Sequence, residues 1–116
     1  MLKKCILPVL FFLISLPLFA EFRTNVHSIS RREGLSNGAV NTIAKDADGY
    51  IWFGTWNGLN RFDGNDMTTY LPGINSYSIH NHVVREVYPT ASGPIWMLTN
   101  KGVGLYNNVQ NRFTSY

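Results

Sequence analysis

The chain has 116 residues and a formal net charge of +3, and 45% of its residues are hydrophobic. Lys3 and Lys4 supply two of the ten basic residues, so the rest of the chain nearly balances its seven acidic residues and offers no basic surface for nucleic acid. The one cysteine, Cys5, lies in the first segment. This position excludes disulfides, thiolate metal sites and cysteine nucleophiles from everything that follows it.

Residues 1–20 have the layout of a secretory signal peptide. Lys3 and Lys4 precede an apolar run that ends at Leu18, and polar residues follow Ala20. The run is short for a membrane span, which needs roughly 20 apolar residues. We therefore expect export to the periplasm with cleavage after Ala20; an uncleaved membrane anchor is the alternative.

Residues 21–33 are expected to form an N-terminal strand. The stretch from Phe22 to Ser30 is strand-like and ends at an Arg-Arg-Glu triplet. No partner strands stand next to it in the sequence, so its partners must lie elsewhere in the fold.

Residues 34–71 are predicted to form four short strands separated by turns. Glycines follow Asp or Asn at positions 49, 58 and 64, and these dipeptides are typical of tight turns because they tolerate a positive φ. The continuous apolar character of the second strand indicates burial on both faces. The predicted strands are 40–45, 50–55, 59–62 and 66–71.

Residues 72–116 repeat this pattern at a distance of 44 positions. The shift pairs Gly49 with Gly93 and Trp52 with Trp96, so that a Gly-x-Ile-Trp motif occurs twice. Such a repeat indicates that the fold is built from copies of one unit. The predicted strands of the second copy are 83–88, 94–99, 103–106 and 112–116.

A repeat of about 40–45 residues with four antiparallel strands is the blade of a β-propeller. We therefore predict an all-β fold: a β-propeller fragment with two four-stranded antiparallel blades, residues 34–71 and 72–116, plus one N-terminal strand. A closed ring takes about four to eight blades. Residues 21–33 would then complete the last blade of a closed propeller. A β-sandwich is the alternative, but it does not explain the repeated motif.

The first unit resembles the two-component regulator propeller repeat. The resemblance rests on GLSN at 34–37, DADGYIWFGT at 46–55 and NGLNRFDG at 57–64, and the second unit is a degenerate copy. The resemblance implies a periplasmic sensor, followed in a full-length member by further blades, a linking β-domain, a membrane helix and a cytoplasmic histidine kinase with its receiver. It implies an oligosaccharide-type ligand and an inner-membrane-anchored, homodimeric parent protein, with any kinase activity outside this chain.

Loops that share one rim of the blades hold the candidate binding residues. The turn after the second strand of a blade lies at the same end as the connection to the next blade, so it joins the connection 72–82 and residues 31–38. Aromatic and amide groups there suit stacking on sugar rings and hydrogen bonding to hydroxyls. The candidate ligand-binding residues are Trp56, Asn57, Tyr77, His80 and Arg32. Trp56 ranks first, because an exposed tryptophan is costly unless something covers it.

Other repeated residues are expected to be structural. Trp52 and Trp96 should pack between neighbouring blades, and Asn37 and Asn81 should close turns. Asp48 should bond the backbone amides of its turn.

No metal or cofactor is predicted. The Asp-x-Asp-Gly turn at 46–49 lacks the distal Glu of a calcium loop, and His80 and His82 have no third ligand close by in the sequence.

We therefore predict a non-enzymatic ligand-sensing module with no catalytic residue. A glycan-active propeller hydrolase or lyase is one alternative, which would need a pair of carboxylates across the scissile bond. The acidic residues instead cluster in turns of the opposite rim, notably Asp46, Asp48, Asp63 and Asp66. An architectural, protein-docking propeller is the other alternative.

Overall fold

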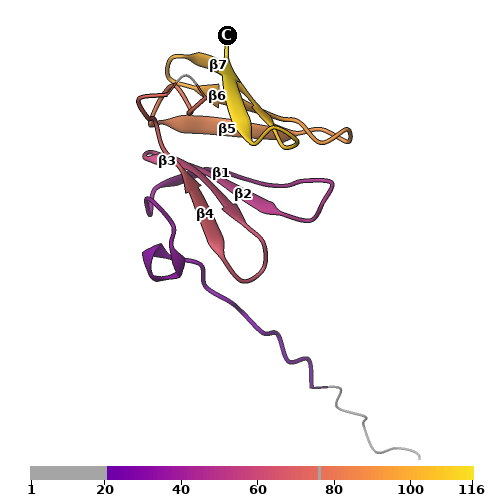
Figure 1. The fold of residues 1–116 in the computed structure, drawn as a ribbon. Helices are drawn as coiled ribbons and strands as arrows, with labels where there is room; N and C mark the ends of the chain where they lie inside the picture. The colour runs from indigo at the N-terminus through magenta and orange to yellow at the C-terminus, as the bar shows by residue number, and fades with distance from the viewer. Residues whose placement is uncertain (1–20, 76) are drawn as a thin grey trace, which may run out of the picture.

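The computed structural model describes residues 21–75 and 77–116, and the expected signal peptide at 1–20 lies outside them. Two four-stranded antiparallel sheets lie one above the other (Figure 1), and within each sheet the strands follow chain order. The predicted all-β fold with two four-stranded blades is confirmed. Among the described residues, no helix is long and apolar enough to cross a membrane.

The first blade consists of β1 (Val40–Lys45), β2 (Ile51–Thr55), β3 (Gly58–Phe62) and β4 (Met67–Tyr70). The second blade consists of β5 (Val84–Pro89), β6 (Ile95–Thr99), β7 (Gly102–Asn107) and β8 (Arg112–Ser115). A short 3₁₀ helix, η1 (Arg31–Glu33), precedes the first blade. Each strand lies within one residue of its predicted bounds, because the glycine turns fix where strands begin and end.

The two blades share one register. Trp52 on β2 lies opposite Arg61 on β3, and Trp96 on β6 lies opposite Leu105 on β7, 44 positions later in each case. The pairing of each first strand also shifts at the same relative point. The repeat in the sequence is therefore a repeat of the fold.

The carboxylate of Asp46 holds the turn between β1 and β2. Its Oδ1 accepts hydrogen bonds from the backbone N–H of Asp48 (2.9 Å) and of Tyr50 (3.0 Å), and its Oδ2 accepts one from Nε1 of Trp52 (2.7 Å). We expected Asp48 in this role, and that expectation is wrong. An Asp side chain bonds the amide two residues ahead, so the first residue of the turn is the one that reaches the following N–H groups.

Asn37 and Asn81 close turns, as predicted. The Oδ1 of Asn37 accepts a hydrogen bond from the N–H of Ala39 at 2.7 Å, and the Oδ1 of Asn81 accepts one from the N–H of Val83 at 2.9 Å. Both turns stand directly before the first strand of a blade, so the repeat includes the entry to each blade.

Residues 21–30 form no strand, in contrast to the expectation for residues 21–33. This segment runs away from the sheets (Figure 1) and is exposed up to residue 28. Regular structure begins only at η1, where Oγ of Ser30 accepts a hydrogen bond from the N–H of Arg32 at 3.2 Å. A strand needs a paired backbone, and neither described sheet pairs with this segment. Its role in completing a last blade stays a prediction.

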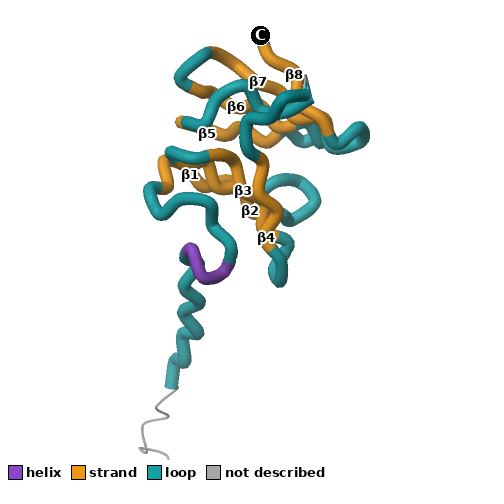
Figure 2. The backbone as a smooth tube through the Cα atoms, turned by 60° about the vertical axis from the view of Figure 1, so that its left-hand side comes forward, coloured by secondary structure: helices purple, strands orange, loops and turns teal. Residues whose placement is uncertain are grey.

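The core lies between the two blades, whose backbones face each other in Figure 2. Trp52 and Leu59 of the first blade form one cluster with Val84, Met97 and Tyr106 of the second. The ring centroids of Trp52 and Tyr106 lie 5.2 Å apart. The predicted packing of Trp52 between neighbouring blades is confirmed.

Trp96 is 39% exposed, so its predicted burial between blades is not found. It lies on the face of the second blade that is turned away from the first. Among the described residues no third sheet covers that face. Its register matches that of Trp52, so the difference in burial comes from the missing cover and not from the strand itself.

Candidate binding site

The turn between β2 and β3 presents Trp56 and Asn57 on a rigid base. Oγ1 of Thr55 donates a hydrogen bond to the carbonyl of Gly58 (2.9 Å) and accepts one from the N–H of Asn57 (3.0 Å). Gly58 has φ 104°, and a Cβ there would lie 2.7 Å from the carbonyl oxygen of Tyr70, so only glycine fits. Trp56 is held at the tip of this turn with 54% of its surface exposed.

The same turn meets the connection to the second blade. The N–H of Gly58 donates to the carbonyl of His82 at 2.6 Å, and Nδ1 of His82 lies 2.9 Å from Oδ1 of Asn57. An amide oxygen only accepts, so His82 carries its proton on Nδ1. The predicted shared rim is thus observed. His82 was not among the five candidates, although its position on the same connection was the signal that could have found it.

His80 lies inside the second blade rather than on the rim surface. Its ring is partly buried, and Nε2 lies 3.0 Å from Oγ1 of Thr99. Because Thr99 donates its hydroxyl hydrogen to the carbonyl of Gly102 at 3.0 Å, His80 is the donor in this pair. In the first blade, Ser36 makes the equivalent contact with Thr55 at 3.3 Å. One ring nitrogen of His80 is therefore occupied in supporting a turn.

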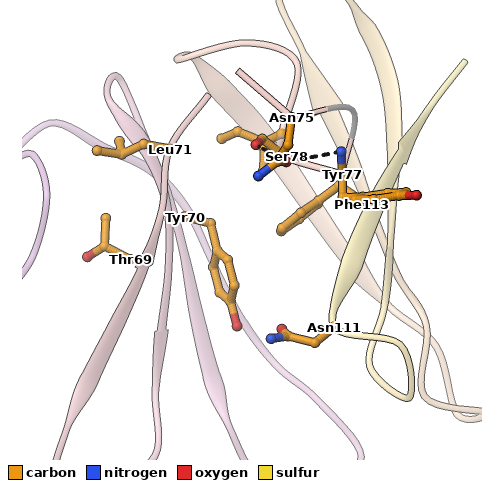
Figure 3. Close-up of a pocket in the computed structure, with 9 residues that line it drawn as sticks. Thr69, Tyr70, Leu71, Asn75, Tyr77, Ser78, Asn111 and Phe113 are labelled. Atoms are coloured by element: carbon orange, nitrogen blue, oxygen red, sulfur yellow. Dashed lines mark hydrogen bonds between the residues drawn. The ribbon is translucent and has the colours of Figure 1, made fainter. Parts of the chain in front are cut away.

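Tyr77 lies beside β8, and Trp56 is not among the described residues that line the hollows next to it. Its carbonyl accepts a hydrogen bond from the N–H of Phe113 on β8 at 2.9 Å, and the guanidinium of Arg112 lies 5.2 Å from its ring centroid. The ring is 56% exposed and borders a cavity between the blades (Figure 3). Tyr77 thus belongs to a crevice on the outer side and not to the Trp56 turn.

Arg32 is exposed on η1, ahead of the first blade. Among the described residues, its only recorded hydrogen bond comes from its backbone N–H, and no contact joins its side chain to the other candidates. The five candidates therefore divide: Trp56 and Asn57 form a rim site with His82, Tyr77 lines the crevice, and His80 and Arg32 lie elsewhere.

The acidic side chains serve turns. Asp63 accepts hydrogen bonds from the N–H of Asp66 (2.7 Å) and of Asn65 (2.8 Å), and these bonds hold the pKa of its carboxyl below the usual value. Asp46 is committed to its own turn, as described above. Within residues 21–75 and 77–116, no three His, Cys, Asp or Glu side chains lie close enough together to bind a metal ion. The rim around Trp56 therefore presents binding groups without a carboxylate pair.

Comparisons with known proteins agree with this architecture. The family model for the two component regulator propeller matches residues 34–57. The extracellular domain of BT3049 from B. thetaiotaomicron, described as a hybrid two component system, is 34% identical with a TM-score of 0.71. The match covers 78% of this chain and 13% of that one. The comparison with curated proteins gave no match.

A second solved structure shows the same fold at lower identity. The extracellular domain of BT4673 from B. thetaiotaomicron, described as a one component system, is 22% identical with a TM-score of 0.65, over 81% of this chain and 14% of that one. The chain thus spans a small part of either relative. Residues 34–57 thus match the two-component regulator propeller repeat, and the fold of the chain is similar to that of the extracellular domain of a hybrid two component system.

Proposed function

We propose that this chain is part of a periplasmic, ligand-sensing propeller in a hybrid two-component system, and that it has no catalytic activity of its own. The similarity to the extracellular domain of BT3049 and the match to the regulator propeller repeat support this proposal. The ligand that fits the rim best is an oligosaccharide. Its binding would change how the sensor domains of an inner-membrane-anchored homodimer are arranged.

The observation that carries the binding role is the exposure of Trp56 on a turn that cannot relax. The turn is fixed by Thr55 and Gly58, and the clasp between Asn57 and His82 ties it to the second blade. A large ring held in place loses little conformational entropy on binding, and its flat apolar face suits a sugar ring.

A hydrolase or lyase fits the described residues less well. Glycoside hydrolysis uses two carboxyl groups about 5–10 Å apart on either side of the bond. Asp46 and Asp63 bind backbone amides in turns of the opposite rim, where these hydrogen bonds stabilise the fold. A purely protein-docking role would use the same exposed Trp56, and ligand binding separates the two functions.

Further blades of the parent chain are the proposed partner of the outward face of the second blade. On that face the rings of Trp96 and Tyr116 pack in a tilted arrangement with centroids 5.8 Å apart, while the equivalent rings of Trp52 and Tyr70 are stacked 5.9 Å apart beneath the second blade. A third blade would cover this face as the second covers the first.

Isothermal titration of the full-length sensor domain with two neutral oligosaccharides, cellotetraose and mannotetraose, tests the rim. We expect one of them to bind, and Trp56→Ala to weaken that binding about tenfold or more, by analogy with the ~1–3 kcal/mol that stacking of a nucleobase on an aromatic residue contributes. Val109→Ala, which changes an exposed apolar residue on the opposite rim, is the matched control. Unchanged affinity in Trp56→Ala would remove this residue from the site.

A further inference from the structure

The crevice on the outer side of the two blades contains two hollows that share Tyr77. The first has a volume of about 270 Å³ and lies between β4, the connection that follows it and the start of β8 (Figure 3). The second, of about 370 Å³, lies along β8. Tyr77 and Phe113 line both hollows. The volumes are near the lower limit of ordinary ligand pockets, about 300 Å³, and suit one ring rather than an extended chain.

Tyr77 is an anchored aromatic platform. Its carbonyl is fixed by the N–H of Phe113 and its own N–H donates to Oδ1 of Asn75 at 3.2 Å. The Arg112 guanidinium packs over the ring. More than half of the ring residue is nevertheless exposed. A flat ring that is fixed at its backbone and open to solvent is suited to stacking against the apolar face of a sugar.

The far end of the first hollow carries oriented polar groups. Oδ1 of Asn111 accepts a hydrogen bond from the hydroxyl of Tyr106 at 2.8 Å, which leaves the amide nitrogen as the donor group of that side chain. The hydroxyl of Tyr70 lies 3.4 Å from that of Tyr106. Burial, and then the hydrogen bond with Tyr106, raise the pKa of Tyr70, so its hydroxyl stays protonated at any physiological pH.

Asn111 is held in the left-handed region at φ 49°, where other non-glycine residues among the described part of the chain are not found. It lies in the hairpin between β7 and β8, which is two residues longer than the hairpin between β3 and β4 because it contains one further strand pair, Asn107 with Arg112. This insertion is the sequence signal that marks the crevice as a difference between the two copies. Asn tolerates this conformation better than most residues, and glycine adopts it freely.

The charged group that lines the crevice is positive. Among the described residues, Arg112 is the only charged one that lines either hollow, and no Asp or Glu of this part of the chain does so. A guanidinium binds a carboxylate through two parallel hydrogen bonds. We propose that the crevice is a second binding site, which takes one pyranose ring carrying a carboxylate, stacked on Tyr77 and paired with Arg112. This site is independent of the rim around Trp56.

Titration of the full-length protein with glucuronate, and with glucose as the neutral match, tests this proposal. We expect glucuronate to bind about tenfold more tightly than glucose, because a charged hydrogen bond contributes more than a neutral one. Tyr77→Ala and Arg112→Gln should each weaken glucuronate binding about tenfold, whereas Tyr77→Phe, which keeps the ring, should retain it. Asn111→Gly should weaken binding while it preserves the conformation of the turn, which an unchanged unfolding midpoint would verify.

Trp56→Ala serves as the control, because it alters the rim and leaves the crevice intact. Its affinity for glucuronate should equal that of the unaltered protein. Equal binding of glucose and glucuronate, or full affinity in Tyr77→Ala, would overturn the proposal. Loss of glucuronate binding in Trp56→Ala would also overturn it, because the acidic sugar would then occupy the rim, and the function proposed for the rim would stand.

Discussion

The two blades are copies in register but not in burial. Trp52 is 1% exposed and its counterpart Trp96 is 39% exposed, although both lie at the same point of the same strand. The opposite faces differ in the reverse sense: Ile43 is 63% exposed in the first blade and its counterpart Val87 is 5% exposed in the second. Each blade therefore has two apolar faces, and stacking decides which of them is covered.

The blades also differ at two neighbouring polar positions, where the side chain becomes larger at one position and smaller at the other. In the first blade, Oδ1 of buried Asn60 accepts a hydrogen bond from the N–H of Ser36 at 3.0 Å, and its amide donates to Oγ of Ser36 at 2.8 Å. The counterparts are Gly104 and His80, and the His80 ring lies 3.4 Å from the point where a Cβ on Gly104 would stand. In the second blade, the larger His80 thus replaces Ser36 before the first strand, and the smaller Gly104 replaces Asn60 on the third strand.

The largest difference in the free energy of unfolding is expected between alanine variants of the two tryptophans. Trp52→Ala should lower the free energy of unfolding by about 3–5 kcal/mol, because it removes a buried ring from the core. Trp96→Ala in the same chain should cost about 1 kcal/mol or less, because its ring is already partly in water. Urea denaturation of the two variants measures this; equal losses would mean that Trp96 is covered in solution.

A second difference concerns the close approach of the blades at Gly54. A Cβ there would lie 2.6 Å from Cγ2 of Thr42 and 2.9 Å from Cγ1 of Val84. Gly54→Ala should therefore cost about 1–3 kcal/mol through overpacking. The counterpart in the second blade is Leu98, where alanine should cost about 1 kcal/mol by loss of a partly buried side chain. A neutral Gly54→Ala in thermal unfolding would contradict the tight contact.

The third expected difference in stability concerns the turn between the first two strands of each blade. Asp46→Ala removes three hydrogen bonds, including that to Nε1 of Trp52, and should cost about 2 kcal/mol. Its counterpart Thr90 donates to the carbonyl of Pro94 at 2.7 Å, and Thr90→Ala should cost about 1 kcal/mol or less. Chemical denaturation of both variants, with Asp48→Ala as the control for the turn, gives the ranking. A larger loss of stability in Asp48→Ala than in Asp46→Ala would mean that Asp48 holds the turn.

The smallest expected difference between the blades is in how their stability depends on pH. The pKa of Asp63 is lowered, chiefly by the N–H of Asp66, so its contribution to stability is present above its ordinary value of 3.8 and is lost as pH falls through the folded value. The counterpart Asn107 accepts the same kind of bonds, from the N–H of Val109 and of Gln110 at 3.0 Å, without titrating. Asp63→Asn should therefore flatten the acid side of the stability curve. An unchanged slope below about pH 4 would contradict this origin.

From the sequence we could predict the two blades, the bounds of their strands and the rim that holds Trp56. These features depend on glycine turns, on Asn37 and Asn81, and on alternation within single strands, which are local properties that one chain segment specifies. The position of Trp56 beside the next connection followed because antiparallel strands place alternate turns at the same end.

Tertiary packing determines which copy of a repeated residue is buried and which side chains from distant parts of the chain meet. Trp52 and Trp96 are alike in sequence, and their exposure differs because one face is covered by a second sheet. The hydrogen bond between Asn57 and His82 joins the two units. The contact of Arg112 with Tyr77 joins residues that are far apart in the chain but lie within the second unit. Such contacts depend on how the chain packs in three dimensions, and the repeated sequence pattern does not specify that packing.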